Sequence, residues 1–420
     1  MRPVLVLALT LPLSRGCGGV PAPPASGDAS GGSDDGSSST GPRREDSGED
    51  GPPSVRFDLG GRDGVVLRGA TVVGTGVRDV TLREGRIARI AAVGDAAPED
   101  DALSEIDARG QYLVPAFIDS HVHLAYAFDA PALAHGGVAA AVDLAAPLAF
   151  FAQDHAPLQL ALAGPMITAV GGYPTQGWGA GGFGLEVEGT DAVRDAVDQL
   201  AGLGARAIKL PLGDAPELSD AEIAVLVERA HARDLPVVVH ALADADASRA
   251  ARAGVDVLAH TPVEPLSDDT VALWQGRTVI STLDAFGGAA GTIDNLRRLR
   301  AAGARVLYGT DLGNTGIPGI DPNELGHLVA AGLDGAAILD AATREPATAW
   351  RFEGLGALAE GARASLLVLD RDPLRDPSVL AEPLAVYIDG VLQPRAWTAG
   401  DGIKDGPSPR PRDPSAPAAR

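Results

Sequence analysis

The chain has 420 residues, and 34 basic against 56 acidic side chains give it a formal net charge of −22 at pH 7. Hydrophobic residues make up 45% and charged residues 21%, which is typical of a globular protein with one large domain or two ordinary ones. Because neutralising phosphates requires clustered positive charge, this balance argues against a nucleic-acid partner. A single cysteine excludes an internal disulfide and a cysteine-based zinc finger.

Residues 1–17 have the pattern of an export signal. Arg2 precedes an apolar run, residues 3–13, which is too short to span a bilayer and has the length of a signal-peptide core. Cys17 follows this core and precedes two glycines, which resembles the lipidation site of a bacterial lipoprotein. We therefore expect an exported protein. It is either anchored to the membrane by a lipid on Cys17, or periplasmic or secreted.

Residues 18–56 and 399–420 have the composition of disordered segments, dominated by Gly, Ser, Pro and Asp with a few charges. Such segments cannot bury enough apolar surface to offset the entropy lost on ordering. We expect residues 18–56 to form a flexible linker and residues 399–420 a disordered tail. A lipid on Cys17 would then be the only contact with a membrane.

Short β-rich runs separated by turns occur in residues 57–115, and the same pattern recurs in residues 351–398. This pattern predicts an antiparallel sheet with one part at each end of the folded chain. We therefore expect a small composite β-sandwich domain, built from both chain ends, with residues 116–350 inserted between its two parts.

Residues 116–350 repeat a strand-then-helix unit, which implies parallel strands. Helix signals separate the strands, including a capping box at Ser219 and Glu222 and a helix start at Asp321 with Pro322. The pattern predicts an α/β fold, a (β/α)8 TIM-like barrel, whose chemistry belongs at the carboxyl ends of its strands. The eight strand candidates are residues 116–119, 139–144, 165–170, 207–210, 236–240, 255–260, 278–282 and 305–311.

Polar residues fall at the ends of these strand candidates. His121 and His123 are two positions apart, so on a strand both imidazoles share a face and can reach one metal ion. His240 and His260 each end an apolar run, where an imidazole without a ligand or hydrogen bond would be costly. Asp311 ends the last candidate. The placement predicts a metal site at one end of the barrel.

Lys209 is one of only two lysines, against 32 arginines, and the other, Lys404, lies in the predicted tail. It sits in a short apolar run, residues 207–210, where a buried ammonium is disfavoured. Lysine, unlike arginine, can lose its proton when desolvated. The neutral amine can then react with CO2 to give a carbamate, a negative group able to bridge two cations.

Together these residues resemble the amidohydrolase superfamily, and within it the imidazolonepropionase-related and prolidase-like branch. The resemblance covers residues 64–395 and implies that His121 and His123 bind one metal ion, with Asp311 as a further ligand. It implies that His240 and His260 bind a second ion and that carboxylated Lys209 bridges the two. The motifs that carry it are residues 115–123, 207–209, 239–240, 257–260, 309–311 and 367–374.

The resemblance implies a metal-dependent hydrolase that cleaves a C–N bond of a small-molecule amide, dipeptide or cyclic amide. A metal-activated hydroxide would attack, with Asp311 as general acid and base. Zinc is the expected ion, because imidazole suits it and the reaction needs no redox chemistry. The alternatives are a mononuclear deaminase, an esterase or lactonase of the same fold, and a catalytically silent surface-binding lipoprotein. Lys209 argues against the deaminase, and six intact ligand candidates argue against the silent protein.

The long Gly- and aromatic-rich segment of residues 171–183 follows the third strand candidate. At this position it is either a lid over the site or a surface loop packed by its own aromatic residues. The sequence assigns no substrate-binding residue. The substrate, the number of metal ions and the oligomeric state therefore stay open at this point.

Overall fold

The computed structural model describes residues 64–95, 103–126, 130–213 and 215–394. All of them belong to one compact unit, Phe57–Arg420. The expected signal segment with Cys17, the linker of residues 18–56 and the tail of residues 399–420 lie outside the described residues. Among the described residues, no helix combines the length and the apolar character that crossing a bilayer requires.

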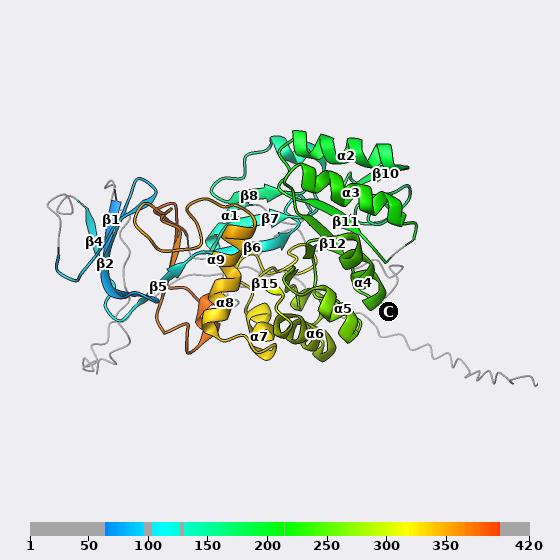
Figure 1. Cartoon of the computed structure of the whole chain (residues 1–420). Coiled ribbons are helices and arrows are strands. Elements are labelled where there is room, and N and C mark those ends of the chain that lie inside the picture. Colours follow the sequence, from blue (N-terminus) through cyan, green and yellow to red (C-terminus); the bar gives the residue numbers. More distant parts are fainter. Residues whose placement is uncertain (1–63, 96–102, 127–129, 214, 395–420) are drawn as a thin grey trace, which may run out of the picture. The chain divides into compact units, whose positions relative to one another are not determined.

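One eight-stranded sheet contains strands from both ends of the folded chain (Figure 1). Its order is β18-β17-β16-β5-β1-β2-β3, and β4 also pairs with β1. The two parts meet where β5 pairs antiparallel with β16. The strands are β1 (Gly64–Val72), β2 (Gly76–Arg83), β3 (Arg86–Ala91), β4 (Ser104–Asp107), β5 (Tyr112–Pro115), β16 (Leu366–Leu369), β17 (Ala385–Ile388) and β18 (Val391–Leu392).

This sheet differs from the expected antiparallel sandwich in two ways. Strands β4 and β5 pair parallel with β1, so the sheet is mixed. The described strands at the two chain ends also form one sheet rather than two packed sheets, so the sandwich is not confirmed. Strand β1 is interrupted by an irregularity between Leu67 and Ala70, where Gly69 adopts a φ of 70°.

The central part of the chain is a TIM-barrel-like α/β fold in which parallel strands alternate with helices (Figure 1). Strands β6, β7 and β8 form one sheet, β9 pairs with β10, and β11 to β15 form a five-stranded sheet. The strands are β6 (Phe117–Val122), β7 (Val138–Asp143), β8 (Gln159–Leu162), β9 (Met166–Ala169), β10 (Gly184–Val187), β11 (Ile208–Pro211), β12 (Val237–His240), β13 (Val257–Leu258), β14 (Thr278–Ile280) and β15 (Arg305–Leu307).

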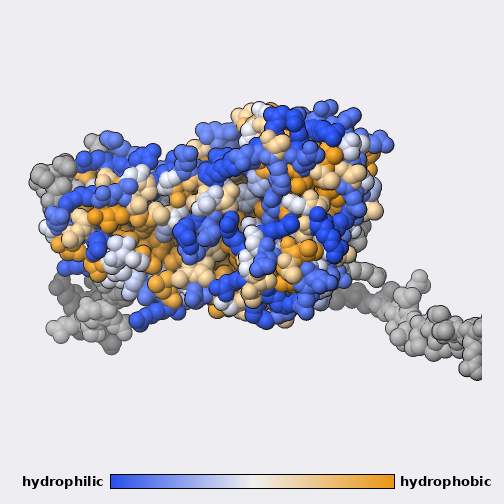
Figure 2. Space-filling model, viewed as in Figure 1, coloured by the Kyte–Doolittle hydropathy of each residue, from blue (hydrophilic) through white to orange (hydrophobic). Residues whose placement is uncertain are grey.

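Successive helices pack against one another along the outside of these strands, from α2 to α7. On the face drawn in Figure 2, hydrophilic side chains are spread among apolar ones. The helices are α1 (Ala130–His135), α2 (Thr190–Gly202), α3 (Asp220–Ala232), α4 (Asp244–Ala253), α5 (Asp268–Leu273), α6 (Ala290–Ala301), α7 (Pro322–Ala330), α8 (Gly335–Ala342) and α9 (Arg344–Ala349), with 3-10 turns η2 (Leu148–Ala152), η3 (Asp284–Phe286) and η4 (Pro377–Ala381).

The parallel strands form separate sheets rather than one closed ladder. Backbone hydrogen bonds nevertheless join β6 to the segment that follows β15. The N–H of Ser120 donates to the carbonyl of Tyr308 at 2.9 Å, and the N–H of Asp311 donates to the carbonyl of His121 at 2.8 Å. These bonds bring the carboxyl ends of the first and last strands together.

The eight strand candidates overlap β6, β7, β9 and β11 to β15. Strands β8 and β10 were missed, because the sequence of β8, Gln-Leu-Ala-Leu, has no β-branched residue and that of β10, Gly-Leu-Glu-Val, has only one. The expected helix signals are confirmed. At the start of α3 the Ser219 hydroxyl accepts a hydrogen bond from the Glu222 N–H, and the Glu222 carboxylate accepts one from the Ser219 N–H. Asp321 caps α7, with Pro322 in the first turn.

Candidate metal centre

Five of the six predicted ligands lie at or just beyond the carboxyl ends of parallel strands, and Lys209 is the second residue of the four-residue strand β11. His121 is on β6, Lys209 on β11, and His240 is the last residue of β12. His123, His260 and Asp311 follow β6, β13 and β15. The structure buries all of them except His240, which is half-buried. Because parallel strands of a barrel end on one face, the fold gathers these residues at a single mouth.

His121, His123 and Asp311 converge on one another. The Nε2 atoms of the two imidazoles are 3.2 Å apart, and Oδ1 of Asp311 lies 3.4 Å from Nε2 of His121 and 3.2 Å from Nε2 of His123. Nδ1 of His121 lies 2.9 Å from the carbonyl oxygen of Ala259, which fixes the ring and leaves Nε2 facing the cluster. Three atoms with ligand character therefore surround one point.

His260 and His240 extend this cluster. The ring of His260 lies 4.6 Å from that of His121 and 4.9 Å from that of His240, measured between centroids. Nδ1 of His260 is 3.1 Å from the Thr282 hydroxyl and 3.8 Å from Oδ2 of Asp311. The ligand atoms of His121, His260 and Asp311 all lie within 4.8 Å of one another, a spacing that fits a metal ion.

The Lys209 amine is fully buried, and its Nζ atom makes no hydrogen bond with the described residues. Burial lowers the pKa of Lys209 to about 7, although the carboxylates of Asp311 and Asp143 favour the charged form. Because buried polar groups almost always have a partner, an unpaired buried amine is unusual. It fits a group whose partner is a ligand or a modification.

Three imidazoles of the cluster, those of His121, His240 and His260, are held neutral. Burial lowers the pKa values of His121 and His260 well below the usual value and that of His240 to about 3. Burial would raise the pKa of Asp311, but the neighbouring histidines hold it well below its usual value. Neutral imidazoles and an ionised carboxylate are the forms that bind metal ions. Oδ1 of Asp311 is buried and, like Lys209, makes no hydrogen bond with the described residues, so the donor set fits a divalent cation.

Two buried aspartates that the sequence analysis missed support the cluster. Asp119 accepts hydrogen bonds from the His121 N–H at 3.0 Å and the Thr310 N–H at 3.1 Å. Asp143 accepts bonds from the backbone around it, and its Oδ1 lies 4.0 Å from Nδ1 of His123. Each acid stands inside or at the end of an apolar strand run, which is the signal that could have identified it.

Asp311 has a φ of 54°, in the left-handed region. Aspartate and asparagine tolerate this conformation better than most residues do. The strained backbone is held by the N–H bond to the His121 carbonyl, and Nδ2 of Asn314 donates to Oδ2 of Asp311 at 2.8 Å. The Asp311 carboxylate is therefore fixed with one oxygen toward Asn314 and the other toward the imidazoles.

The aromatic loop of residues 171–183 contacts two of the predicted ligands. Tyr173 stacks on His240 at 5.1 Å between centroids, and Trp178 lies 5.3 Å from His123. Nε1 of Trp178 donates a hydrogen bond to the Tyr173 hydroxyl at 3.0 Å, and Trp178 also packs on Phe183. The loop is thus packed by its own aromatic residues, as one of the two interpretations expected, and it also borders the cluster.

Comparison with known proteins decides the family. The sequence profile of the Amidohydrolase family matches residues 112–392, more than half of the chain. The chain belongs to the amidohydrolase family. The family that the motifs predicted is therefore confirmed, and family membership together with the buried cluster of His121, His260 and Asp311 suggests metal binding.

Curated relatives of this amidohydrolase match over part of their length. An uncharacterized protein of Mycobacterium tuberculosis is 30% identical over 240 residues, which cover 50% of this chain and 64% of that protein. An adenine deaminase of Deinococcus deserti is 28% identical over 350 residues, covering 75% of this chain and 58% of the deaminase. The chain therefore spans about two thirds or less of the relatives it matches.

Solved structures with the same fold are prolidase-like amidohydrolases. A Xaa-Pro dipeptidase with methionine in its active site gives a TM-score of 0.67 at 20% identity, covering 78% of this chain and 99% of the dipeptidase. A prolidase in complex with N-methylphosphonate-L-proline gives 0.65 at 23% identity, with 78% and 99% covered. A prolidase-type protein of Bifidobacterium longum gives 0.64 at 24% identity, with 79% and 94% covered. At these identities the likeness concerns the fold.

Proposed function

We propose that this amidohydrolase is a metal-dependent hydrolase that cleaves a C–N bond in a small-molecule amide, dipeptide or cyclic amide. The observation that carries the proposal is the convergence of His121, His123 and Asp311, whose ligand atoms lie 3.2 to 3.4 Å apart in a buried site. Family membership supports hydrolytic chemistry. The net charge of −22 supports the expectation of no nucleic-acid partner.

The donor set suits zinc, and we propose two ions. His121, His123 and Asp311 would hold one, and His240 and His260 would hold the other. When bound, such ions polarise a carbonyl group and lower the pKa of a water molecule from 15.7 toward about 7. The remaining steps of the proposed mechanism are carried out by side chains of the protein.

Lys209 would bridge the two ligand sets as a carbamate. Its buried, unpaired amine lies on β11, beside the strand that carries His240. Attack of the neutral amine on the carbon of CO2 forms an N–C bond and releases one proton, leaving a carboxylate on the side chain. The added negative charge would join that of Asp311 in offsetting two cations.

Asp311 would act as general base and then as general acid. Its carboxylate accepts a proton from the water whose oxygen attacks the substrate carbonyl carbon, and returns that proton to the leaving nitrogen as the C–N bond breaks. The carboxylate is ionised again at the end of the cycle. Its fixed orientation, set by Asn314 and the His121 carbonyl, places it for both transfers without rearrangement.

A deaminase is the second candidate, and the adenine deaminase relative favours it. The two activities release different products from the same kind of site: ammonia from an amino-substituted ring, and an amine with a carboxylic acid from an amide. Esterase or lactonase activity is a further alternative, because an activated water also attacks esters.

Product analysis tests the proposed function. Zinc-loaded protein is incubated with dipeptides, N-acyl amino acids, cyclic amides, adenine, and esters matched to the amides, and products are identified by mass spectrometry. We expect amide cleavage that is lost in His121→Ala and kept in the control His231→Ala, whose imidazole pairs with Asp256 on the surface. Ammonia release from adenine alone, ester cleavage alone, or no turnover by metal-loaded protein would contradict the proposal.

We also propose that the protein is exported and anchored by a lipid on Cys17, with the periplasm or the medium as the alternatives. The apolar run before Cys17 and the polar linker after it support this proposal. Labelling with a fatty-acid analogue in a bacterial host should mark the wild-type chain and not Cys17→Ala. An unlabelled wild-type chain in the soluble periplasmic fraction would contradict the anchor, and a cytoplasmic chain would contradict export.

A further inference from the structure

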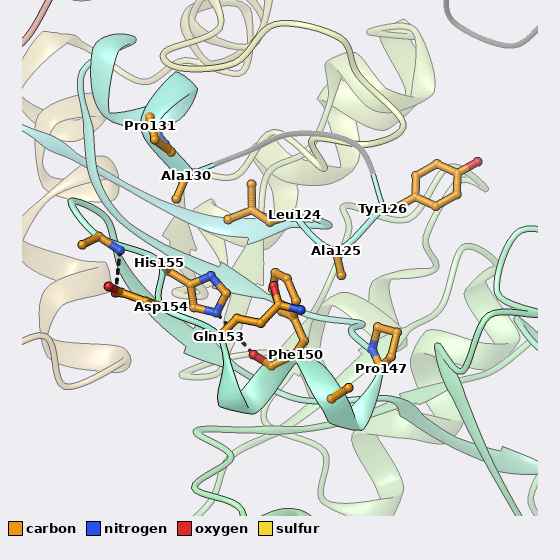
Figure 3. A pocket seen from close by; sticks show the side chains of 12 residues that line it. Leu124, Ala125, Tyr126, Ala130, Pro131, Pro147, Phe150, Gln153, Asp154 and His155 are labelled. Atoms are coloured by element: carbon orange, nitrogen blue, oxygen red, sulfur yellow. Dashed lines mark hydrogen bonds between the residues drawn. The ribbon is translucent and has the colours of Figure 1, made fainter. Parts of the chain in front are cut away.

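A pocket of about 650 Å³ lies between the segments that follow β6 and β7 (Figure 3). Both segments leave the carboxyl ends of their strands, so the pocket opens on the same side of the fold as the metal centre. Its size falls within the range of about 300–1,000 Å³ that ligand pockets occupy. Its lining includes Leu124, Tyr126, Pro131, Pro147, Phe150 and His155.

Two sets of contacts link the wall of the pocket to side chains beside the metal centre, although none of the six predicted ligands lines the pocket itself. Leu124, in the pocket wall, donates its N–H to Asp143, the carboxylate beside His123. Tyr126 packs on Trp178 at 5.6 Å between ring centroids, and Trp178 in turn lies 5.3 Å from His123. A group held in the pocket therefore lies along the same aromatic wall that borders the predicted metal ligands.

The lining combines aliphatic and aromatic side chains with three polar ones, Gln153, Asp154 and His155. Among the described residues that line the pocket, none is a lysine or an arginine. Asp154 accepts a hydrogen bond from the Ala156 N–H, and the His155 ring packs on Phe150 at 4.5 Å. A carboxylate entering this pocket would lose water without gaining a cationic partner, whereas an apolar ring would gain buried contacts.

We propose that this pocket binds an uncharged apolar or aromatic substituent of the amide, so that the preferred substrates lack a carboxylate on that group. The inference rests on the proposed function for its link to catalysis. It selects among the substrate classes considered above: neutral N-acyl amides and cyclic amides over dipeptides with a free carboxylate in this position.

The substrate test uses acetamides whose nitrogen carries a methyl, cyclohexyl, phenyl or 4-carboxyphenyl group, and a second series that varies the acyl side in the same way. The cyclohexyl and methyl substrates compare a large with a small apolar group on similar leaving amines. The phenyl and 4-carboxyphenyl substrates differ in the charge of the carboxylate. We expect two differences in one of the two series. There, kcat/KM should be at least about tenfold higher for the cyclohexyl substrate than for the methyl substrate, and at least about tenfold higher for the phenyl substrate than for the 4-carboxyphenyl substrate. Equal values within both series would overturn the inference.

Two variants test the location of the subsite. Ala149 is exposed and lines the pocket, so Ala149→Trp fills it without disturbing the core, and Ala152→Trp on the same 3-10 turn is the matched control because Ala152 is exposed outside the lining. We expect Ala149→Trp alone to lower kcat/KM for the phenyl substrate about tenfold and to leave the methyl substrate unchanged. Gln153→Arg, which adds a cation to the lining, should raise kcat/KM for the 4-carboxyphenyl substrate.

A binding measurement separates this inference from the proposed function. Saturation-transfer NMR with acetophenone, a ketone that carries the same phenyl group and cannot be hydrolysed, should show saturable binding to wild-type protein and to Ala152→Trp but not to Ala149→Trp. If no amide is hydrolysed but this pattern appears, the proposed function fails and the pocket stands. If amides are hydrolysed but Ala149→Trp behaves like Ala152→Trp, the subsite inference fails and the proposed function stands.

Discussion

The carboxylate of Asp119 accepts two hydrogen bonds from Thr310, one from the backbone N–H at 3.1 Å and one from the hydroxyl at 2.6 Å. The same carboxylate accepts the His121 N–H at 3.0 Å. Thr310 directly precedes Asp311, and Asp119 lies on the strand that carries His121. One buried side chain thus sets the distance between the first and last predicted ligands of the chain.

Replacement of Asp119 should weaken metal binding without removing a ligand. We expect Asp119→Ala to lower zinc affinity about 10- to 100-fold and the free energy of unfolding by about 1–3 kcal/mol, because buried donors lose their acceptor. Asp119→Asn should keep most of the zinc affinity and of the free energy of unfolding, since the amide oxygen can still accept the hydrogen bonds from the backbone N–H groups. Competition with a zinc chelator and urea unfolding measure the two effects; an unchanged affinity in Asp119→Ala would contradict this role.

Asp311→Asn should remove turnover and preserve the fold. Asparagine tolerates the φ of 54° at this position but cannot take the proton of the attacking water, so kcat should fall about 10²- to 10⁴-fold. Asp234→Asn is the matched control, because Asp234 is an exposed aspartate with a φ of 58° that pairs with Arg351. Steady-state kinetics with circular dichroism decide the matter, and near-normal kcat in Asp311→Asn would rule out the proposed proton transfer.

The proposed carbamate on Lys209 can be tested directly because the chain has only one other lysine, Lys404. After exchange with ¹³C-bicarbonate, we expect a carbamate ¹³C NMR signal in the wild type and in the control Lys404→Met, and its absence in Lys209→Met. Metal content should fall with the signal, since Lys209→Met removes the proposed bridge. A signal that persists in Lys209→Met would show that it comes from another amine.

Glu324 should make stability depend on pH. Burial raises the pKa of Glu324 to about 8, from an ordinary value of 4.5, although hydrogen bonds from Ser281 and the Asp284 N–H favour the ionised form. Between about pH 4.5 and 8 the folded state keeps a proton that the unfolded state has lost. The free energy of unfolding therefore falls as pH rises through this window, by at most about 1.4 kcal/mol per pH unit.

Glu324→Gln removes that proton equilibrium, so its unfolding free energy should change less between pH 5 and pH 8 than that of the wild type. Urea unfolding across the window measures the difference. The control is Glu353→Gln at an exposed position, which should follow the wild type. Parallel pH profiles for the wild type and Glu324→Gln would contradict a buried, protonated Glu324.

The sequence predicted the ligand candidates because their signal is local. His121 and His123 alternate on a strand, and Lys209 is a rare residue inside an apolar run, so period and composition identify both. The caps at Ser219 and Asp321 are local for the same reason, and the structure confirms them. The strand-then-helix repeat likewise indicated the TIM-barrel-like fold.

The features that the sequence did not predict depend on contacts between distant segments. The parallel pairing of β4 with β1 leaves no period in the sequence, and an antiparallel sandwich was expected instead. The link from Asp119 to Thr310 and the stacking of Tyr173 on His240 join residues far apart in the chain. A loop rich in aromatic residues has the same composition whether its rings border a site or pack only on one another. Only the fold distinguishes these two arrangements.

Anomalous X-ray scattering from zinc-loaded crystals tests the central claim most directly. The account predicts two zinc peaks at the barrel mouth, one in contact with His121, His123 and Asp311 and one with His240 and His260, bridged by density that extends Lys209 by a carboxylate. A zinc-soaked crystal with no anomalous peak at these side chains would contradict the claim that they form a metal centre.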